Sequence, residues 1–190
     1  MKRVLVVLPA VAALLMISRP SFAAGNASAR LTLHLMGVTT KNVCTRALVP
    51  CEQIVTSAPL YPNLRFAYVL VTRGSAAEGI AGLQFGIQYG GAGAADGVGF
   101  DVFNWTRCAD FEFEPPNPAW PNSGSGNTMT WIACQNTEPG GPGTGVHAVA
   151  GYFYCAAYSP DCLTLTPRPV DNACMVSNCA AVADVISNHP

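Results

Sequence analysis

Charged side chains are scarce in this sequence. Asp, Glu, Lys and Arg together make up 11% of the residues, and lysine occurs only as Lys2 and Lys41. Nucleic acids and anionic membranes are bound by clustered Lys and Arg side chains, and the sequence contains no such cluster. We therefore expect neither a nucleic acid nor an anionic membrane surface as the partner.

A long apolar run is also missing. The N-terminal apolar stretch, Val4–Ile17, is too short to cross a bilayer as a helix. It follows Lys2 and Arg3 and precedes Ser21-Phe22-Ala23, which places small residues at the −3 and −1 positions of a cleavage site. This predicts a signal peptide over residues 1–23 and a secreted protein, periplasmic or extracellular. Ala27-Ser28-Ala29 offers a second cleavage point.

Cleavage after residue 23 leaves 167 of the 190 residues, enough for a single domain with its own core over residues 24–190. It also removes Lys2, Arg3 and Arg19, so that 7 basic residues remain against 11 acidic ones, a formal charge of −4. No membrane span is expected in the mature chain.

Short C-x2-C pairs, the usual mark of a structural zinc site, do not occur. Eight cysteines behind an export signal favour disulfides, because the compartment beyond the membrane is oxidising. A metal site and a reactive thiol are the alternatives. The simplest pairing joins neighbours: Cys44 with Cys51, Cys108 with Cys134, Cys155 with Cys162, and Cys174 with Cys179.

No segment shows a long helical period, whereas alternation with a period of two recurs. Leu31, Leu33 and Leu35 share one face of a predicted strand, and Leu64–Thr72 is apolar enough to be buried on both faces. Turns rich in Gly and Pro separate such segments. Strands are predicted at 30–36, 64–72, 82–89, 98–105, 109–114, 129–134, 146–155, 163–166 and, with one helical turn as the alternative, 179–186.

This pattern predicts an all-β protein, an antiparallel β-sandwich of about eight or nine strands of the immunoglobulin, cohesin or jelly-roll kind, crosslinked by disulfides. A closed barrel is the alternative. The runs AGLQFGIQYGG, VGFDVFNW, GNTMTWIAC and GVHAVAGYFYC resemble the strand order of cohesin-like bacterial β-sandwich modules over Ala81–Thr166. The cysteines and the insert Pro115–Asn127 depart from that family's pattern, so the resemblance implies a fold and no functional residue.

Three carboxylates alternate with apolar residues in one predicted strand. Asp110, Glu112 and Glu114 would share one face, as a calcium-binding edge or as a solvated face that discourages aggregation. The same spacing could suit a glycosidase pair, but one-strand spacing is generic. Calcium is therefore the one cofactor considered.

Aromatic residues suggest a second kind of site. Trp105 and Trp131 fall within predicted strands and are expected in the core, whereas Trp120 lies in the Pro-rich segment 117–122 and is expected to be exposed. An exposed indole could stack on a sugar. His34 and His147 are expected at the surface or at a strand edge.

Motifs of known catalytic sites are absent, including H-E-x-x-H and G-x-S-x-G. We expect a protein that is not an enzyme, with a structural, adhesive or protein-interaction role at the cell surface or in the extracellular space. Its expected partner is another secreted or surface protein. A carbohydrate-binding module that uses Trp120 and a hydrolase with a loop-assembled site are the alternatives.

Overall fold

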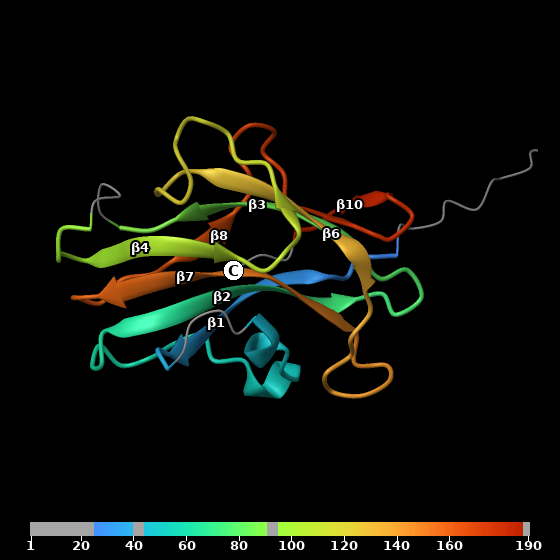
Figure 1. The fold of residues 1–190 in the computed structure, drawn as a ribbon, viewed down its shortest axis with the longest axis horizontal. Coiled ribbons are helices and arrows are strands. Elements are labelled where there is room, and N and C mark those ends of the chain that lie inside the picture. The colour runs from blue at the N-terminus through green and yellow to red at the C-terminus, as the bar shows by residue number, and fades with distance from the viewer. Residues whose placement is uncertain (1–24, 40–43, 91–94, 188–190) are drawn as a thin grey trace, which may run out of the picture.

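The computed structural model describes residues 25–39, 44–90 and 95–187, and the predicted signal peptide lies outside them. The chain forms two antiparallel sheets packed face to face, as Figure 1 shows. One sheet has the order β1-β2-β7-β4, and the other has the order β10-β9-β3-β6-β5 with β8 also paired to β3. The predicted antiparallel β-sandwich is confirmed.

The first sheet consists of β1 (Arg30–Gly37), β2 (Leu64–Gly74), β4 (Phe100–Arg107) and β7 (Val146–Ala157). The second consists of β3 (Ile80–Gln88), β5 (Phe111–Glu112), β6 (Gly126–Gln135), β8 (Thr164–Thr166), β9 (Met175–Ser177) and β10 (Ala183–Val185). Each of the nine predicted strands overlaps an observed one, and the short strand β9 was not predicted.

The main core lies between the two sheets and follows the alternation of the sequence. Leu31 and Leu33 point inward from β1, and Phe85 and Ile87 point inward from β3 to meet them in one buried cluster. Each such side chain contributes about 1.5–3 kcal/mol of hydrophobic stabilisation when fully buried. Alternation therefore reports which face of each sheet is buried.

A second core covers the outer face of the first sheet. The 3-10 turns η1 (Cys44–Ala47) and η2 (Cys51–Gln53) lie on this outer face, over side chains of β2 and β7, on the side away from the second sheet (Figure 1). We call the segment of residues 44–55 the flap. Its contacts with the sheet include Ala47, Phe66, Tyr68, Leu70, Val149 and Tyr152. β2 is therefore buried on both faces, as its continuous apolar run predicted.

Strands β8 and β9 act as two halves of one interrupted strand. Thr166 pairs with Gly86 and Met175 pairs with Gln84, both antiparallel to β3. The chain leaves the sheet between them in a loop closed by an Arg168–Asp171 ion pair of 2.6 Å. β9 has a single inward apolar residue, Val176, and therefore no alternation, whereas β8 lies in the alternating run Leu163–Thr166, which explains why only β8 was predicted.

The disulfides join segments that are distant in sequence. Cys44 pairs with Cys108 and Cys134 pairs with Cys179, with sequence separations of 64 and 45. The predicted pairing of neighbours is therefore wrong. The flap carries Cys44 over the sheet to the end of β4, and β6 ends beside the loop that precedes β10. Which cysteines lie close together depends on the order of the strands in the sheets, and the spacing of cysteines in the sequence does not reveal that order.

The other four cysteines form no disulfide in the structure, against the prediction that all eight do. Cys51 and Cys162 are exposed, and Cys155 and Cys174 are buried. Burial raises the pKa of the Cys155 thiol to about 12 and that of Cys174 to about 11, so both stay protonated at neutral pH. The two buried thiols are inert packing groups.

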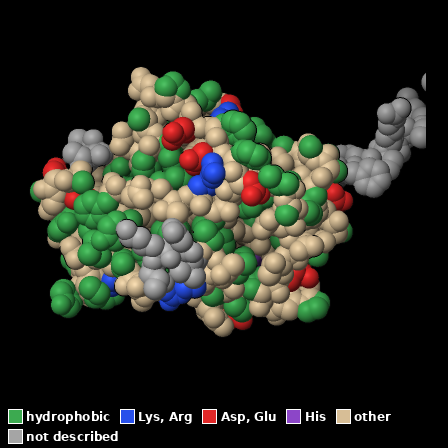
Figure 2. Space-filling view, viewed as in Figure 1, with side chains coloured by type: hydrophobic (Ala, Val, Ile, Leu, Met, Phe, Trp, Pro, Cys, Tyr) green, Lys and Arg blue, Asp and Glu red, His purple; other side chains and the backbone are tan. Residues whose placement is uncertain are grey.

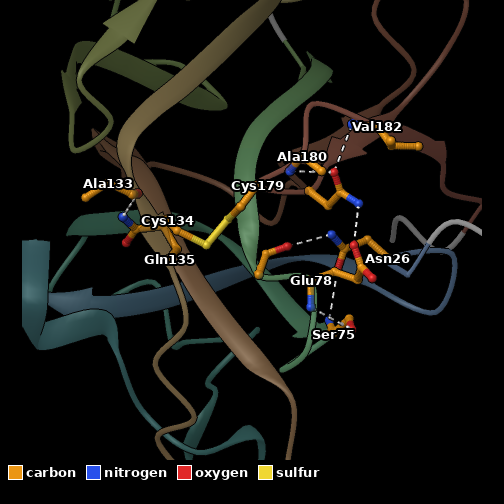
Figure 3. Close-up of a disulfide and its surroundings, with 11 residues drawn as sticks. Asn26, Ser75, Glu78, Ala133, Cys134, Gln135, Cys179, Ala180 and Val182 are labelled. Carbon is orange, nitrogen blue, oxygen red and sulfur yellow. Dashed lines mark hydrogen bonds between the residues drawn. A yellow bond between two sulfur atoms is a disulfide. The ribbon is translucent and has the colours of Figure 1, made fainter.

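A buried polar cluster adjoins the Cys134–Cys179 disulfide (Figure 3). The backbone N–H of Asn26 donates to Asp184, and its side-chain amide donates to the Gly79 carbonyl, both at 2.8 Å. The Asn26 side-chain oxygen accepts the Ser75 N–H at 2.8 Å. These bonds join the start of the described chain to the β2–β3 turn and to β10.

Candidate functional site

Trp120 is not exposed, contrary to the sequence-based expectation. Its ring is half-buried and lies edge-on to Phe85 and Trp105, with centroids 5.5 and 5.2 Å away, and tilted against Phe153. The Pro-rich segment folds back over the sandwich and inserts the indole between the sheets. Trp120 thus offers no free face on which a sugar could stack. Trp131 lies in the core and Trp105 packs against it, as expected.

The predicted carboxylate row is divided by the structure. Glu112 turns toward the interior, where it accepts hydrogen bonds from the Trp105 indole N–H at 3.0 Å and from the Asn127 amide at 3.3 Å. Asp110 accepts the backbone N–H of Ile132 at 2.7 Å and so caps the β5–β6 pairing. Glu114 follows the strand and is exposed. Two of the three carboxylates thus stabilise the sheet edge.

The inward turn of Glu112 sends the neighbouring aromatic residues outward. Phe111 is 51% exposed and Phe113 is 60% exposed. Phe111 pairs with Thr130 on β6. Ile132 lies two residues further along the same face of β6 and is 75% exposed. We call Phe111, Phe113 and Ile132 the aromatic edge. An edge strand with phenylalanine outside and glutamate inside reverses the usual amphipathic arrangement, and exposed apolar groups of this size mark interaction surfaces.

The surface as a whole is poor in charge. Figure 2 shows few Lys, Arg, Asp or Glu side chains on the visible face, and apolar side chains reach the surface in several patches. The exposed large apolar residues outside the aromatic edge include Tyr61, Val98, Val170 and Val185. They belong to different strands and loops, whereas the aromatic edge brings together three such residues, one on β5, one just after β5 and one on the paired strand β6.

Both described histidines are buried, contrary to expectation, because the flap covers the outer face of the first sheet. His34 on β1 is 4% exposed and His147 on β7 is 2% exposed. Burial is the main cause that lowers the pKa of each below its ordinary value, so both are neutral at pH 7. Nε2 of His147 lies 3.5 Å from the Cys51 thiol of the flap. His189 lies outside the described residues.

Two cavities border the flap and the segment that follows it. One is a recess of about 600 Å³ lined by residues that include Arg30, Cys51, Arg73 and His147. The other, of about 800 Å³, opens at the end of the sandwich and is lined mainly by apolar side chains such as Leu33, Phe100 and Leu163. Two thiols line the second cavity: Cys155, which is protonated and offers no nucleophile, and Cys162, which is exposed.

The described residues contain no group of three or more His, Cys, Asp or Glu side chains that could hold a metal ion. The calcium site at Asp110, Glu112 and Glu114 stays a prediction, and melting with and without EDTA tests it. None of the described helices is both long and apolar enough to span a membrane.

Comparison with known proteins gives a likeness of fold. A cohesin module from a family 33 glycoside hydrolase of Clostridium perfringens is similar to this chain, with 10% sequence identity and a TM-score of 0.43. The match covers 65% of this chain and 78% of the module. No family model matches the sequence, and no curated protein matches it significantly.

Proposed function

We propose that this protein is an exported, non-catalytic β-sandwich that binds another secreted or surface protein through the aromatic edge. The observation that carries the proposal is the reversed orientation of β5, which exposes Phe111 and Phe113 and turns the half-buried carboxylate of Glu112 toward Trp105. Exposed aromatic side chains on rigid strands supply large contact area at little entropic cost, and aromatic residues are enriched in interfaces.

The edge position of β5 adds a second mode of contact. β5 is the last strand of its sheet, so a partner can add hydrogen bonds to its outer side as well as apolar contacts to its face. The two disulfides and the interlocked Trp105, Glu112 and Asn127 side chains hold this edge in place. A preorganised edge loses little conformational entropy when a partner binds.

The role as an exported protein rests on the N-terminal sequence and on the disulfides, which form in oxidising compartments. The carbohydrate-binding alternative depended on an exposed Trp120, and that residue is packed between the sheets. Protein binding is therefore the role that the described surface supports best.

Site-specific photocrosslinking tests the proposal. A photoreactive amino acid replaces Phe113 in the full-length exported protein, and a matched variant carries it at Val170, which is 67% exposed on the β8–β9 loop. We expect a discrete protein adduct from position 113 among the proteins that the producing cell exports, and none from position 170. Equal labelling at both positions, or no adduct at 113, contradicts the proposal.

A substitution at the same surface gives an independent measurement. Phe111→Ser combined with Phe113→Ser removes the apolar face while leaving Glu112 and its partners in place. We expect the adduct to disappear in a protein that carries the crosslinker at Ile132, with the melting temperature almost unchanged, because exposed side chains contribute little to stability. A homodimer adduct would identify the partner as a second copy and contradict a different protein as the partner.

A further inference from the structure

Cys51 and His147 form a thiol–imidazole pair assembled by the fold. The Cys51 sulfur lies 3.5 Å from Nε2 of His147, although the two residues are 96 positions apart in the sequence. Cys51 is exposed at the start of η2, whereas the His147 side chain lies beneath it on the outer face of β7. When Nε2 carries no proton, it accepts the thiol proton of Cys51.

The His147 ring is buried between the flap and the sheet, where the Val49 backbone and the Cys51 thiol lie next to it. Its Nδ1 is buried without a hydrogen bond of good geometry, and its side chain lines the recess together with Cys51. Burying a polar group without a well-formed hydrogen bond lowers the free energy of unfolding by about 1–3 kcal/mol. An apolar residue would therefore be the more stabilising choice if this side chain served only to fill space. Its ring is neutral at rest and available as a base.

The recess above this pair is basic although the chain as a whole is not. Arg30 and Arg73 line it, together with the single carboxylate of Glu52. Arg73 has a positive φ of 56°, rare for a residue other than glycine, at a register shift between β2 and β7. Two guanidinium groups beside an exposed thiol favour a reagent that carries carboxylates.

We propose that Cys51 is the reactive thiol of this protein and that it exchanges with small anionic disulfides held by Arg30 and Arg73. The Cys51 proton moves to Nε2 of His147 as the sulfur attacks one sulfur of the bound disulfide. A bond then forms between Cys51 and that sulfur while the bond within the reagent breaks. The leaving thiolate takes the proton back from the imidazolium and departs as a free thiol.

The exchange balances without a further oxidant. Cys51 is oxidised to a mixed disulfide, and half of the reagent is reduced to a thiol, with one reagent consumed for each chain. The product is a covalent cap on the flap, so this is a modification site and is distinct from the aromatic edge proposed above. Failure of one proposal leaves the other standing.

Cys162 is the matched control within the same chain. It too is exposed and unpaired, and it too has a neighbouring carboxylate: Asp161 accepts its backbone N–H at 2.7 Å, and Glu52 follows Cys51. The buried thiols Cys155 and Cys174 remain protonated and do not compete. A Cys162→Ser variant therefore reports the reaction of Cys51, and a Cys51→Ser variant reports that of Cys162.

The experiment treats both variants of the full-length exported protein with glutathione disulfide at neutral pH and follows the mixed disulfide by intact mass. We expect Cys51 to react roughly 5- to 10-fold faster than Cys162, because the imidazole of His147 is placed to accept the Cys51 proton as the sulfur attacks. Equal rates for the two thiols, or a faster Cys162, overturn the proposal.

Reagent charge tests the two arginines. Glutathione disulfide is anionic, hydroxyethyl disulfide is neutral and cystamine is cationic. Replacing Arg30 and Arg73 by Gln in the Cys162→Ser protein should slow the reaction with glutathione disulfide by about 3-fold or more and should leave the neutral reagent unaffected. An equal effect on all three reagents contradicts anion recognition.

His147→Gln should slow the reaction of Cys51 with all three reagents, and added free imidazole should restore part of the rate with the neutral one. If that variant does not fold, the comparison between Cys51 and Cys162 in the protein with His147 intact still decides the proposal. An unchanged rate in a folded His147→Gln protein removes the imidazole from the mechanism.

Discussion

The backbone N–H of Val55 donates a hydrogen bond to Nδ1 of His34, 3.0 Å away, beneath the flap. The same residue accepts the Leu35 N–H through its carbonyl at 2.7 Å, so Val55 is joined to β1 on both sides. His34 can accept its bond only while Nδ1 is unprotonated. The attachment of the flap is therefore sensitive to acid.

Acid should destabilise the protein through its two buried histidines. Burial lowers the pKa of His34 and of His147 in the folded state below the ordinary value of 6.5. Between the two values the unfolded chain binds more protons, so this stability is fully present above about pH 6.5 and is lost as pH falls toward the lowered folded pKa. Urea unfolding at about pH 7.5 and pH 5.5 measures the loss.

Gln at both histidine positions should flatten this part of the pH profile, because glutamine does not titrate. A profile that stays equally steep in the double variant would assign the acid sensitivity to carboxylates elsewhere.

Each disulfide should contribute about 4 kcal/mol to the free energy of unfolding, given loops of 64 and 45 residues. The Cys44→Ser/Cys108→Ser and Cys134→Ser/Cys179→Ser proteins should each lose an amount of this order in denaturant titrations. Cys162→Ser is the control and should change the free energy by less than about 0.5 kcal/mol, because the residue is exposed and unpaired. Peptide mapping without reduction should recover the two long-range pairs and none of the neighbour pairs.

Glycine at position 79 should be required for the Cys134–Cys179 crosslink. Gly79 has a φ of +63°, and a Cβ atom there would collide with both sulfurs. We expect Gly79→Ala to lower the melting temperature and to slow formation of this disulfide. Gly97→Ala is the matched control, since Gly97 also has positive φ but has nothing within 4 Å of the added methyl group. Equal decreases in melting temperature in the two variants would show that backbone strain, and not the collision with the sulfurs, causes the effect.

Trp120→Ala should destabilise the fold by about 3 kcal/mol, because the ring fills space between Phe85, Trp105 and Phe153. Retention on polysaccharide columns should be the same for the variant and the unaltered protein. Loss of polysaccharide retention at unchanged stability would restore the carbohydrate-binding hypothesis.

Asn26 should be retained after export. Cleavage at the second candidate point, after Ala29, would remove the side chain that bonds Gly79 and Ser75. Cleavage after residue 23 keeps it, and we expect the mature N-terminus at Ala24, as N-terminal sequencing would show. Recovery of a stable mature protein that begins at Arg30 would show that this polar cluster is dispensable.

Periodicity predicted the sandwich because the burial of each residue in a strand depends on its own sequence neighbours. The inward set of β3, Leu83 to Ile87, is found where alternation places it. Which segments pair with one another across the fold does not depend on sequence neighbours in this way. Cys44 meets Cys108 only because the flap crosses the outer face of the first sheet, and no local pattern describes that crossing.

The candidate sites were harder to predict for the same reason. Glu112 alternates with Phe111 and Phe113 as if it faced solvent, and its inward turn depends on Trp105 and Asn127 from other strands. Cys51 and His147 lie in unrelated segments, and neither carries a local motif. The apolar residues Ile54 and Val55, shortly after Cys51, were the available signal that residues 44–55 would pack on the sheet and bury His34 and His147.

The interruption between β8 and β9 has a consequence for how the chain can be altered. Both halves are aligned by their own pairing to β3, so the connecting loop does not set their alignment. A guest peptide inserted at Val170, which points into solvent, should be displayed without shifting either half. The fold thus provides a natural grafting position, remote in sequence from both surfaces proposed to bind.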